Sequence, residues 1–211
     1  MAHQHEAEPD PSKSTSAGNP VRKVHHARIG FTKAYNLVLF LLFGGALMGF
    51  TLARFMYMDV DNVFCGPGFS PTRRASPGEC YHYRSGLYRA AMLLHLACFL
   101  PAGFLVVFQF VPAIRRRWIL AHRINGYLVL LLSIPGTVGA LIVTRRAFGG
   151  GVDVQTGFGM IAFMFMVAIV SAYVSIKRLR IDRHRAWMLR AWFYVRLYCF
   201  SLLSIHFITS T

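Results

Sequence analysis

Five long runs of apolar residues dominate the chain, and shorter polar and basic stretches separate them. Hydrophobicity is continuous within each run and does not follow the two-residue period of a half-buried strand. A helix that crosses a bilayer needs about 20 largely apolar residues, and each run is close to that length. The pattern therefore predicts an all-α integral membrane protein with five transmembrane helices, over Tyr35–Ala53, Ala90–Ile114, Ile124–Thr144, Thr156–Ile176 and Ala186–Thr209.

The first and fifth runs differ from the three between them. Gly44, Gly45 and Gly49 give the first run a smooth surface that lets another helix approach closely. We expect this helix to flank a bundle made by the other four. The fifth run is interrupted by Arg190 and Arg196, so a helix lying along the membrane surface is the alternative to a span.

The polar stretches set the domain organisation. Residues 1–34 are polar and basic and are expected to form a disordered tail, while residues 35–211 form a helical membrane domain. The tail contains no cleavable signal peptide, so the first span is expected to direct insertion. Residues 57–88 are rich in Gly, Pro, Ser and Tyr and are predicted to form a loop outside the membrane.

Composition agrees with a membrane protein, and charge indicates its orientation. Hydrophobic residues make up 55% of the chain, and the formal net charge is +15. The Lys and Arg residues gather beside the spans, which argues against nucleic acid and favours anionic lipid headgroups as partners. Because the basic excess lies on the side of the N-terminus, we expect a cytoplasmic N-terminus and an outside or lumenal C-terminus.

Four cysteines divide between the loop and the spans. Cys65 and Cys80 both fall in the predicted outer loop, where an oxidising compartment allows them to form a disulfide. Cys98 and Cys199 lie within spans and are expected to pack as small apolar residues. The expected topology and the placement of the cysteines agree.

Four histidines fall at two depths. His122 and His184 open the third and fifth runs, and each is followed by an arginine. With a rise of about 1.5 Å per residue, His95 is roughly 28 Å from the inner end of the second run. His206 is roughly 33 Å beyond His184 on one side of the same helix. We therefore expect His122 and His184 near the inner face, and His95 and His206 near the outer face.

Two histidine pairs at matched depths are what two haem b groups would need, with an imidazole on each side of each iron. Two simpler roles stay open for these side chains. A histidine followed by an arginine at the start of a span often anchors a helix in the headgroups, which applies to His122 and His184. Within a span, His95 and His206 can simply form hydrogen bonds between helices.

Arg196 lies roughly 15 Å into the fifth run, too deep to reach the surface easily. All acidic residues of the chain lie in the tail or the loops, so no carboxylate within a span can neutralise it. Main-chain carbonyls, hydroxyls or water are one solution, and a bound anion or substrate is the other. Arg123, beside His122, is a second candidate for contacting an anion.

A weak internal repeat relates two of the basic loops. The segment RRWILAHR (116–123) aligns with RLRIDRHR (178–185), matching Arg, Ile, His and Arg. Each copy joins one span to the next. The repeat indicates two related helix hairpins, an arrangement known among membrane proteins.

The segments AHRINGYLVL (121–130) and HRAWMLR (184–190), with FQF (108–110) upstream, resemble a multi-pass membrane family of unknown function, DUF2306. The resemblance covers roughly the second to fifth spans and implies the membrane fold without a reaction. The arrangement also looks like cytochrome b561, which carries two haems on four histidines, although this chain has two candidates on its fifth span and none on its fourth. The resemblance to DUF2306 singles out His95, Gln109, His122, Arg123, Gly126, Tyr127, His184, Arg185, Trp187, Met188 and Arg190.

Three functional hypotheses follow. The first is transmembrane electron transfer through b-type haem, with His95 and His206 as the outer ligands and His122 and His184 as the inner ones. The second is a non-redox accessory protein or enzyme that acts on a lipophilic substrate in a small-molecule biosynthetic pathway, with Arg196 and His206 facing the pocket. The third is a structural or lipid-binding protein without catalysis.

Overall fold

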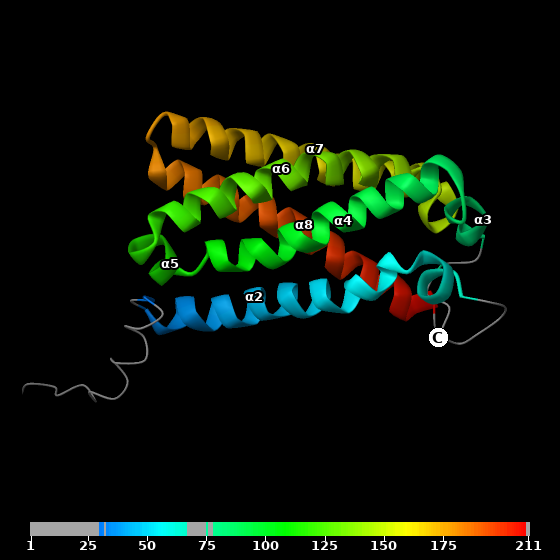
Figure 1. Cartoon of the computed structure of the whole chain (residues 1–211), viewed down its shortest axis with the longest axis horizontal. Coiled ribbons are helices and arrows are strands. Elements are labelled where there is room, and N and C mark those ends of the chain that lie inside the picture. The colour runs from blue at the N-terminus through cyan, green and yellow to red at the C-terminus, as the bar shows by residue number, and fades with distance from the viewer. Residues whose placement is uncertain (1–29, 32, 67–74, 76–77, 210–211) are drawn as a thin grey trace, which may run out of the picture.

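The computed structural model describes residues 30, 31, 33–66, 75 and 78–209, with side chains up to residue 196. The predicted tail therefore lies almost entirely outside the described residues. The described part is helical throughout (Figure 1). Its elements are α2 (Ala34–Phe55), η1 (Met56–Met58), η2 (Val60–Phe64), α3 (Glu79–Tyr83), α4 (Gly86–Gln109), α5 (Pro112–Arg117), α6 (Ile119–Thr144), η3 (Ala147–Gly150), α7 (Val152–Lys177) and α8 (Ile181–Thr209).

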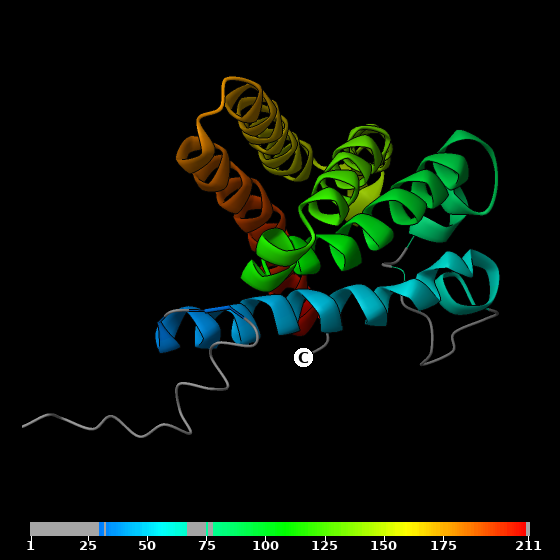
Figure 2. The same cartoon turned by 60° about the vertical axis from the view of Figure 1, so that its left-hand side comes forward.

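Two antiparallel hairpins build the bundle. Helix α4 packs along α6, and α7 packs along α8, while the two hairpins meet each other over a smaller contact between α6 and α7. Figure 2 shows the α7–α8 pair inclined away from the α4–α6 pair. The two basic segments of the sequence repeat lie at the α4–α6 and α7–α8 connections, in agreement with the predicted pair of hairpins.

The structure corrects two predicted helix ends. The apolar pattern predicts that the second run continues to Ile114, but α4 ends at Gln109 and a short helix, α5, begins at Pro112. Proline lacks a backbone N–H and fits the first turn of a new helix better than the interior of an old one. Helix α6 begins earlier than expected, at Ile119, so His122 lies inside its first turn.

Four helices among the described residues are long and apolar enough to cross a membrane: α2 with η1, α4, α6 and α7. The prediction of an all-α membrane protein is confirmed, but the count of five spans is too high by one. Helix α8 is long, yet its described half carries Asp182, Arg190 and Arg196. Its mixed composition separates it from the other four.

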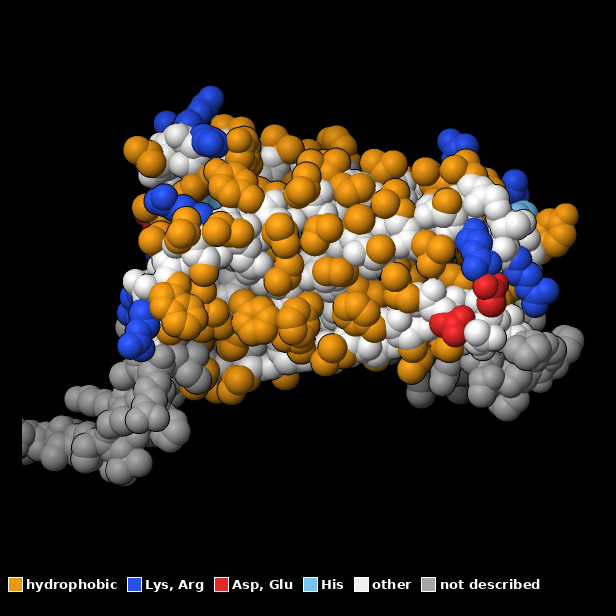
Figure 3. Space-filling model, viewed as in Figure 1, with side chains coloured by type: hydrophobic (Ala, Val, Ile, Leu, Met, Phe, Trp, Pro, Cys, Tyr) orange, Lys and Arg blue, Asp and Glu red, His pale blue; other side chains and the backbone are white. Residues whose placement is uncertain are grey.

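The surface of the bundle suits a lipid environment. Large apolar side chains are exposed along every one of the four spanning helices, among them Leu42, Phe104, Leu131 and Phe163. Figure 3 shows hydrophobic side chains covering the middle of the visible face, while charged side chains gather at its two ends. In water such a surface would associate, whereas in a bilayer it faces acyl chains.

A core shared by α4, α6, α7 and α8 lies midway along the bundle. We call it the central core: Ala102, Val106, Val129, Phe165, Ala168, Ile169, Ala191 and Trp192. Helix α2 lies outside it and packs on α4, where the buried Thr51 faces Gly103. The expected arrangement of four bundled helices and one flanking helix agrees with this packing.

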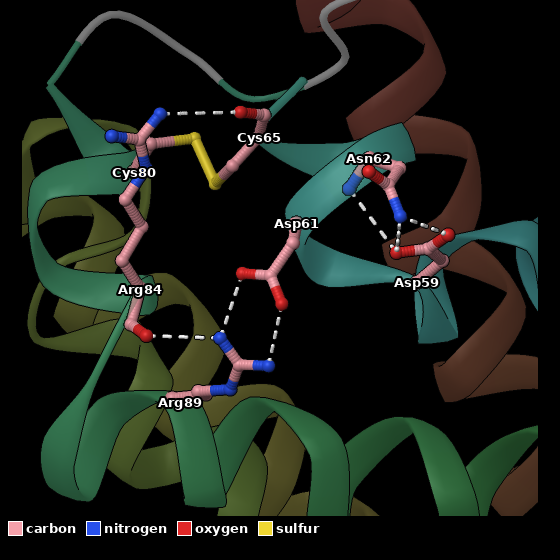
Figure 4. Close-up of polar contacts among 7 residues, drawn as sticks. All are labelled: Asp59, Asp61, Asn62, Cys65, Cys80, Arg84 and Arg89. Carbon is pink, nitrogen blue, oxygen red and sulfur yellow. Dashed lines mark hydrogen bonds and ion pairs between the residues drawn. A yellow bond between two sulfur atoms is a disulfide. The ribbon is translucent and has the colours of Figure 1, made fainter. Parts of the chain in front are cut away.

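A compact cap closes one end of the bundle, here called the disulfide end. Cys65 and Cys80 form a disulfide, as predicted, and both are buried beside Phe64 and Tyr83. The predicted loop over residues 57–88 therefore contains the short helices η2 and α3. Figure 4 shows the disulfide above the ion pair between Asp61 and Arg89, which joins this cap to the start of α4.

The cap is also tied to the turn between α6 and α7. The buried carboxylate of Glu79 accepts a hydrogen bond of 2.7 Å from the backbone N–H of Phe148. Phe148 has a φ of 51°, a left-handed conformation that is unfavourable for an aromatic residue. The Tyr83 hydroxyl donates to the Val143 carbonyl at 3.3 Å. These bonds hold the turn in place and connect both hairpins at this end.

The Asp61–Arg89 ion pair predicts a measurable dependence of stability on pH. The hydrogen bond from Arg89 lowers the pKa of Asp61 below its usual value, so the pair stabilises the folded protein above the unfolded pKa near 3.8. That contribution disappears as pH falls through the lowered pKa. Thermal unfolding in detergent should show a higher Tm for the native protein than for Asp61→Asn at pH 6, and a shrinking difference below pH 4. A difference that is constant with pH would contradict this assignment.

Candidate functional site

Basic side chains from three helices converge at the end of the bundle opposite the disulfide. We call this the α5 end, made by residues 112–123 of α5 and α6 and residues 177–185 of α7 and α8. The charges of Arg115, Arg123 and His184 all act on His122. The predicted inner pair, His122 and His184, therefore lies at the same end of the bundle, on α6 and α8, within range of electrostatic interaction.

His184 is held in a defined orientation. Its Nδ1 lies 2.9 Å from the carbonyl oxygen of Ala172 on the neighbouring helix α7. Since a carbonyl can only accept, Nδ1 must carry the proton. In the neutral ring, Nε2 then holds the free lone pair.

His122 is only partly satisfied. Its backbone carbonyl accepts a hydrogen bond of 2.9 Å from Nε2 of Gln109, at the end of α4. Its ring nitrogen Nδ1 is buried and has no hydrogen-bond partner among the described residues. A buried polar atom without a partner is unfavourable by about 1–3 kcal/mol, so this nitrogen calls for an explanation.

Arg115 brings a further positive charge to the α5 end. Partial burial lowers the pKa of Arg115 below its usual value, and the charges of Arg185 and Arg116 lower it further. The guanidinium stays protonated at neutral pH because its ordinary pKa is above 12. Among the described residues of this end, Arg185 forms an ion pair with an acidic residue, the exposed Asp182, at a distance of 3.8 Å. The α5 end is therefore strongly positive.

His95 lies in the other half of the bundle, inside the contact between α4 and α6. Its Nδ1 donates to the Gly136 carbonyl at 2.9 Å, and its ring packs against Phe99 with centroids 5.1 Å apart. Gly139 approaches the backbone of His95 so closely that a Cβ there would lie 2.9 Å from the His95 nitrogen. Helices α4 and α6 are in direct contact at this level.

The predicted outer partner, His206, belongs to the part of α8 whose side chains lie outside the described residues. Cys199 belongs to the same part. The pairing of His95 with His206 therefore stays a prediction. The side chain of Cys98 is buried and unpaired, as expected for a cysteine that packs as an apolar residue. No cluster of three or more His, Cys, Asp or Glu side chains suited to a metal ion occurs among the described residues.

Arg196 uses a main-chain carbonyl, one of the two solutions that its depth in the sequence left open. Its Nη1 donates to the Phe43 carbonyl at 2.7 Å, and its guanidinium lies 4.1 Å from the centre of the Phe43 ring. The residue thereby joins α8 to the flanking helix α2. Arg123 is exposed at the α5 end. Contact of either arginine with an anion or substrate stays a prediction.

Two residues that the sequence did not single out for function have unusual surroundings. Asn125 donates from Nδ2 to the Leu105 carbonyl at 3.0 Å, while its Oδ1 is buried without a partner among the described residues. Trp192 is 5% exposed, and its Nε1–H likewise lacks a partner there. The Trp192 ring packs in the central core. Asn125 could have been singled out from the sequence, because it is a polar residue inside an apolar span.

Several residues singled out by the family motifs lie in contact with one another at or near the α5 end. A Cβ on Gly126 would lie 3.5 Å from Nε2 of Gln109, the atom that binds the His122 carbonyl. On α8, the Arg190 guanidinium lies 4.7 Å from the centre of the Trp187 ring. The segments FQF and AHRINGYLVL thus meet in space at the α5 end.

Comparison with known proteins gives a family and no reaction. No curated protein and no solved structure matches the chain. A family described as "Predicted membrane protein (DUF2306)" matches residues 92–209, which include most of α4 and all of α5 to α8. This match covers more than half of the chain and contains both histidine–arginine motifs. The chain is a multi-pass membrane protein that belongs to the DUF2306 family.

Proposed function

We propose that this protein binds b-type haem and transfers electrons across the membrane. The observation that carries the proposal is that His122 and His184, from α6 and α8, lie at the α5 end within range of electrostatic interaction. Bis-histidine ligation requires imidazoles from different helices at the same depth in a bundle. Of the two expected ligand pairs, this is the one whose side chains both lie among the described residues.

The residues present fit a haem in two respects. Histidines that bind a metal usually donate their second ring N–H to a carbonyl or carboxylate, and His184 does so with Ala172. His122 offers a buried ring nitrogen that has no partner among the described residues. His95 is held in a similar way, because its Nδ1 is hydrogen-bonded to the Gly136 carbonyl.

The chain's own groups have defined roles in this proposal. The Ala172 carbonyl fixes the tautomer of His184, and Arg115, Arg123 and Arg185 provide positive charge that offsets the propionates. When bound, haem supplies a one-electron carrier whose potential depends on its axial ligands and on burial.

Transfer across the whole bilayer needs a second carrier near the disulfide end, and His95 with His206 remains our proposal for its ligands. We also propose a cytoplasmic N-terminus, which places the α5 end beside anionic lipid headgroups on the inner side. In this orientation Cys65 and Cys80 face an oxidising compartment, which is where disulfides persist.

The absorption spectrum of the purified protein tests the proposal. Protein expressed with sufficient haem should show a reducible Soret band, because His122 and His184 would hold the haem at the α5 end. Either His122→Ala or His184→Ala should remove the contribution of that haem, leaving at most a second haem bound through His95. The measurement is the haem content per protein in each purified variant.

His82→Ala is the matched control. His82 belongs to α3 at the disulfide end, where its ring packs between Tyr81 and Tyr88, so its replacement should leave the haem content unchanged. Colourless native protein from haem-sufficient cells would refute the proposal. Equal loss of colour in all three variants would indicate unfolding and would likewise count against specific ligation.

A separate observation favours the second hypothesis, a membrane protein that acts on or accompanies a lipophilic substrate. Two buried polar atoms, on Asn125 and Trp192, lie beside the central core without partners among the described residues. Haem ligation at the α5 end does not use either of them. A lipophilic ligand with polar atoms of its own offers hydrogen-bond partners for groups of this kind.

A further inference from the structure

A hydrogen-bond acceptor and a hydrogen-bond donor are left unsatisfied inside the described part of the bundle. The acceptor is Oδ1 of Asn125 on α6, and the donor is Nε1–H of Trp192 on α8. The amide orientation of Asn125 is fixed, because its Nδ2 donates to the Leu105 carbonyl. The free atom of this side chain is therefore an acceptor.

Both residues border the central core. Trp192 belongs to it and packs edge-on against Phe165, with centroids 6.0 Å apart. Asn125 precedes the core residue Val129 by one helical turn, and its partner Leu105 packs against the same core. One residue comes from each hairpin, Asn125 from α6 and Trp192 from α8.

This part of the core is apolar, aromatic and uncharged. Its buried members include no acidic or basic side chain among the described residues, and Phe99 continues the aromatic row beyond Phe165, with centroids 5.8 Å apart. A ligand with an anionic or cationic group would lack a counter-charge here, so a charged ligand is disfavoured. A neutral ring that carries its own polar atoms is compatible with both the packing and the hydrogen bonds.

We propose that the seam between the hairpins binds a quinol-type lipid, a neutral aromatic ring with two oxygen substituents and an apolar tail. One hydroxyl of the ring donates to Oδ1 of Asn125, and an oxygen of the ring accepts from Nε1–H of Trp192. The ring packs beside Phe165, and the tail lies among the lipid-facing side chains. The ligand enters from the bilayer by separating the hairpins, whose mutual contact is smaller than the contacts within each of them.

Two probes that differ only in hydrogen bonding test this site. Decylhydroquinone has two hydroxyl donors, and its dimethyl ether has none, while the ring and the tail are shared. Binding is measured as the excess of radiolabelled probe in lipid nanodiscs that contain the protein over empty nanodiscs, under anaerobic conditions. The native protein should bind the hydroquinone roughly ten-fold more tightly than the ether, which is the effect of one buried hydrogen bond.

Variants of Asn125 and Trp192 test whether these two residues form the hydrogen bonds to the probe. Asn125→Leu should reduce binding of the hydroquinone to the level of the ether, with binding of the ether unchanged. Trp192→Phe keeps an aromatic ring and removes the donor, so it should weaken binding of both probes several-fold. Trp118→Phe is the matched control, because Trp118 is 64% exposed at the start of α6 and should have no effect.

Equal affinity of the native protein for the two probes, or no binding of either, would overturn the proposal. So would a preference for the hydroquinone that survives in Asn125→Leu. If Asn125→Leu does not fold, the proposal is still tested by comparing the binding of the two probes to the native protein and to Trp192→Phe. The site does not depend on haem: colourless protein that selects the hydroquinone would refute the proposed electron transfer and support this inference.

Discussion

Replacing Gly139 by alanine should destabilise the protein by about 3 kcal/mol or prevent it from folding, the largest single-residue effect that we expect. A Cβ at this position would lie 2.7 Å from the Ala91 carbonyl oxygen and 2.9 Å from the His95 nitrogen. Both are backbone atoms, so no side chain can turn away to make room. Helices α4 and α6 would have to separate, and the contact of His95 with Gly136 would be lost.

Gly157→Ala is the control for this prediction. Gly157 lies in α7, and a Cβ there would meet no atom within 4 Å. This variant should keep or slightly raise the stability, since alanine favours a helix more than glycine does. Thermal unfolding in the same detergent compares the two variants. Equal Tm values for Gly139→Ala and the native protein would show that α4 and α6 do not meet as closely as described.

Removing the disulfide should be the next largest effect. The bond joins residues separated by 15 positions, and closing a loop of that size stabilises a fold by about 3 kcal/mol. The double variant Cys65→Ala/Cys80→Ala should therefore unfold at a clearly lower temperature than the native protein. The loss concerns the cap, whose buried residues Phe64 and Tyr83 pack around the bond.

A reducing agent separates the bond from the side chains. It should lower the Tm of the native protein towards that of the double variant and leave the double variant unchanged. Cys98→Ala, which alters a buried cysteine outside the disulfide, should keep the sensitivity to reduction. A native Tm that does not respond to a reductant able to reach the bond would contradict a stabilising role for the disulfide.

The helices were predictable because the bilayer leaves few alternatives. Every backbone polar group within lipid needs a partner, so a long apolar run must form a helix. The ends of the helices were less predictable. Apolar residues continue past Gln109, and the turn before Pro112 follows from the missing N–H of proline and not from hydrophobicity. The sequence pattern predicted a fifth span over α8. Arg190 and Arg196, which interrupt that apolar run, make α8 less apolar than the four spanning helices.

The position of the candidate histidines along their helices was predictable from the sequence, but the orientation of their rings was not. The rise along a helix predicted one depth for His122 and His184, and both lie at the α5 end within range of electrostatic interaction. The direction of each ring follows from its neighbours: Ala172 binds His184, and Gly136 binds His95. Neither carbonyl stands out in the sequence, because every residue has one.

The sequence by itself determined that this is a helical membrane protein of the DUF2306 family, with a disulfide in the loop over residues 57–88. These properties follow from composition, length and spacing, which do not depend on how the helices pack. Only the tertiary structure decided which face of each helix meets another, because within lipid all apolar faces are nearly equivalent and close fit selects among them. That selection left the polar atoms of Asn125 and Trp192 without partners among the described residues beside the central core.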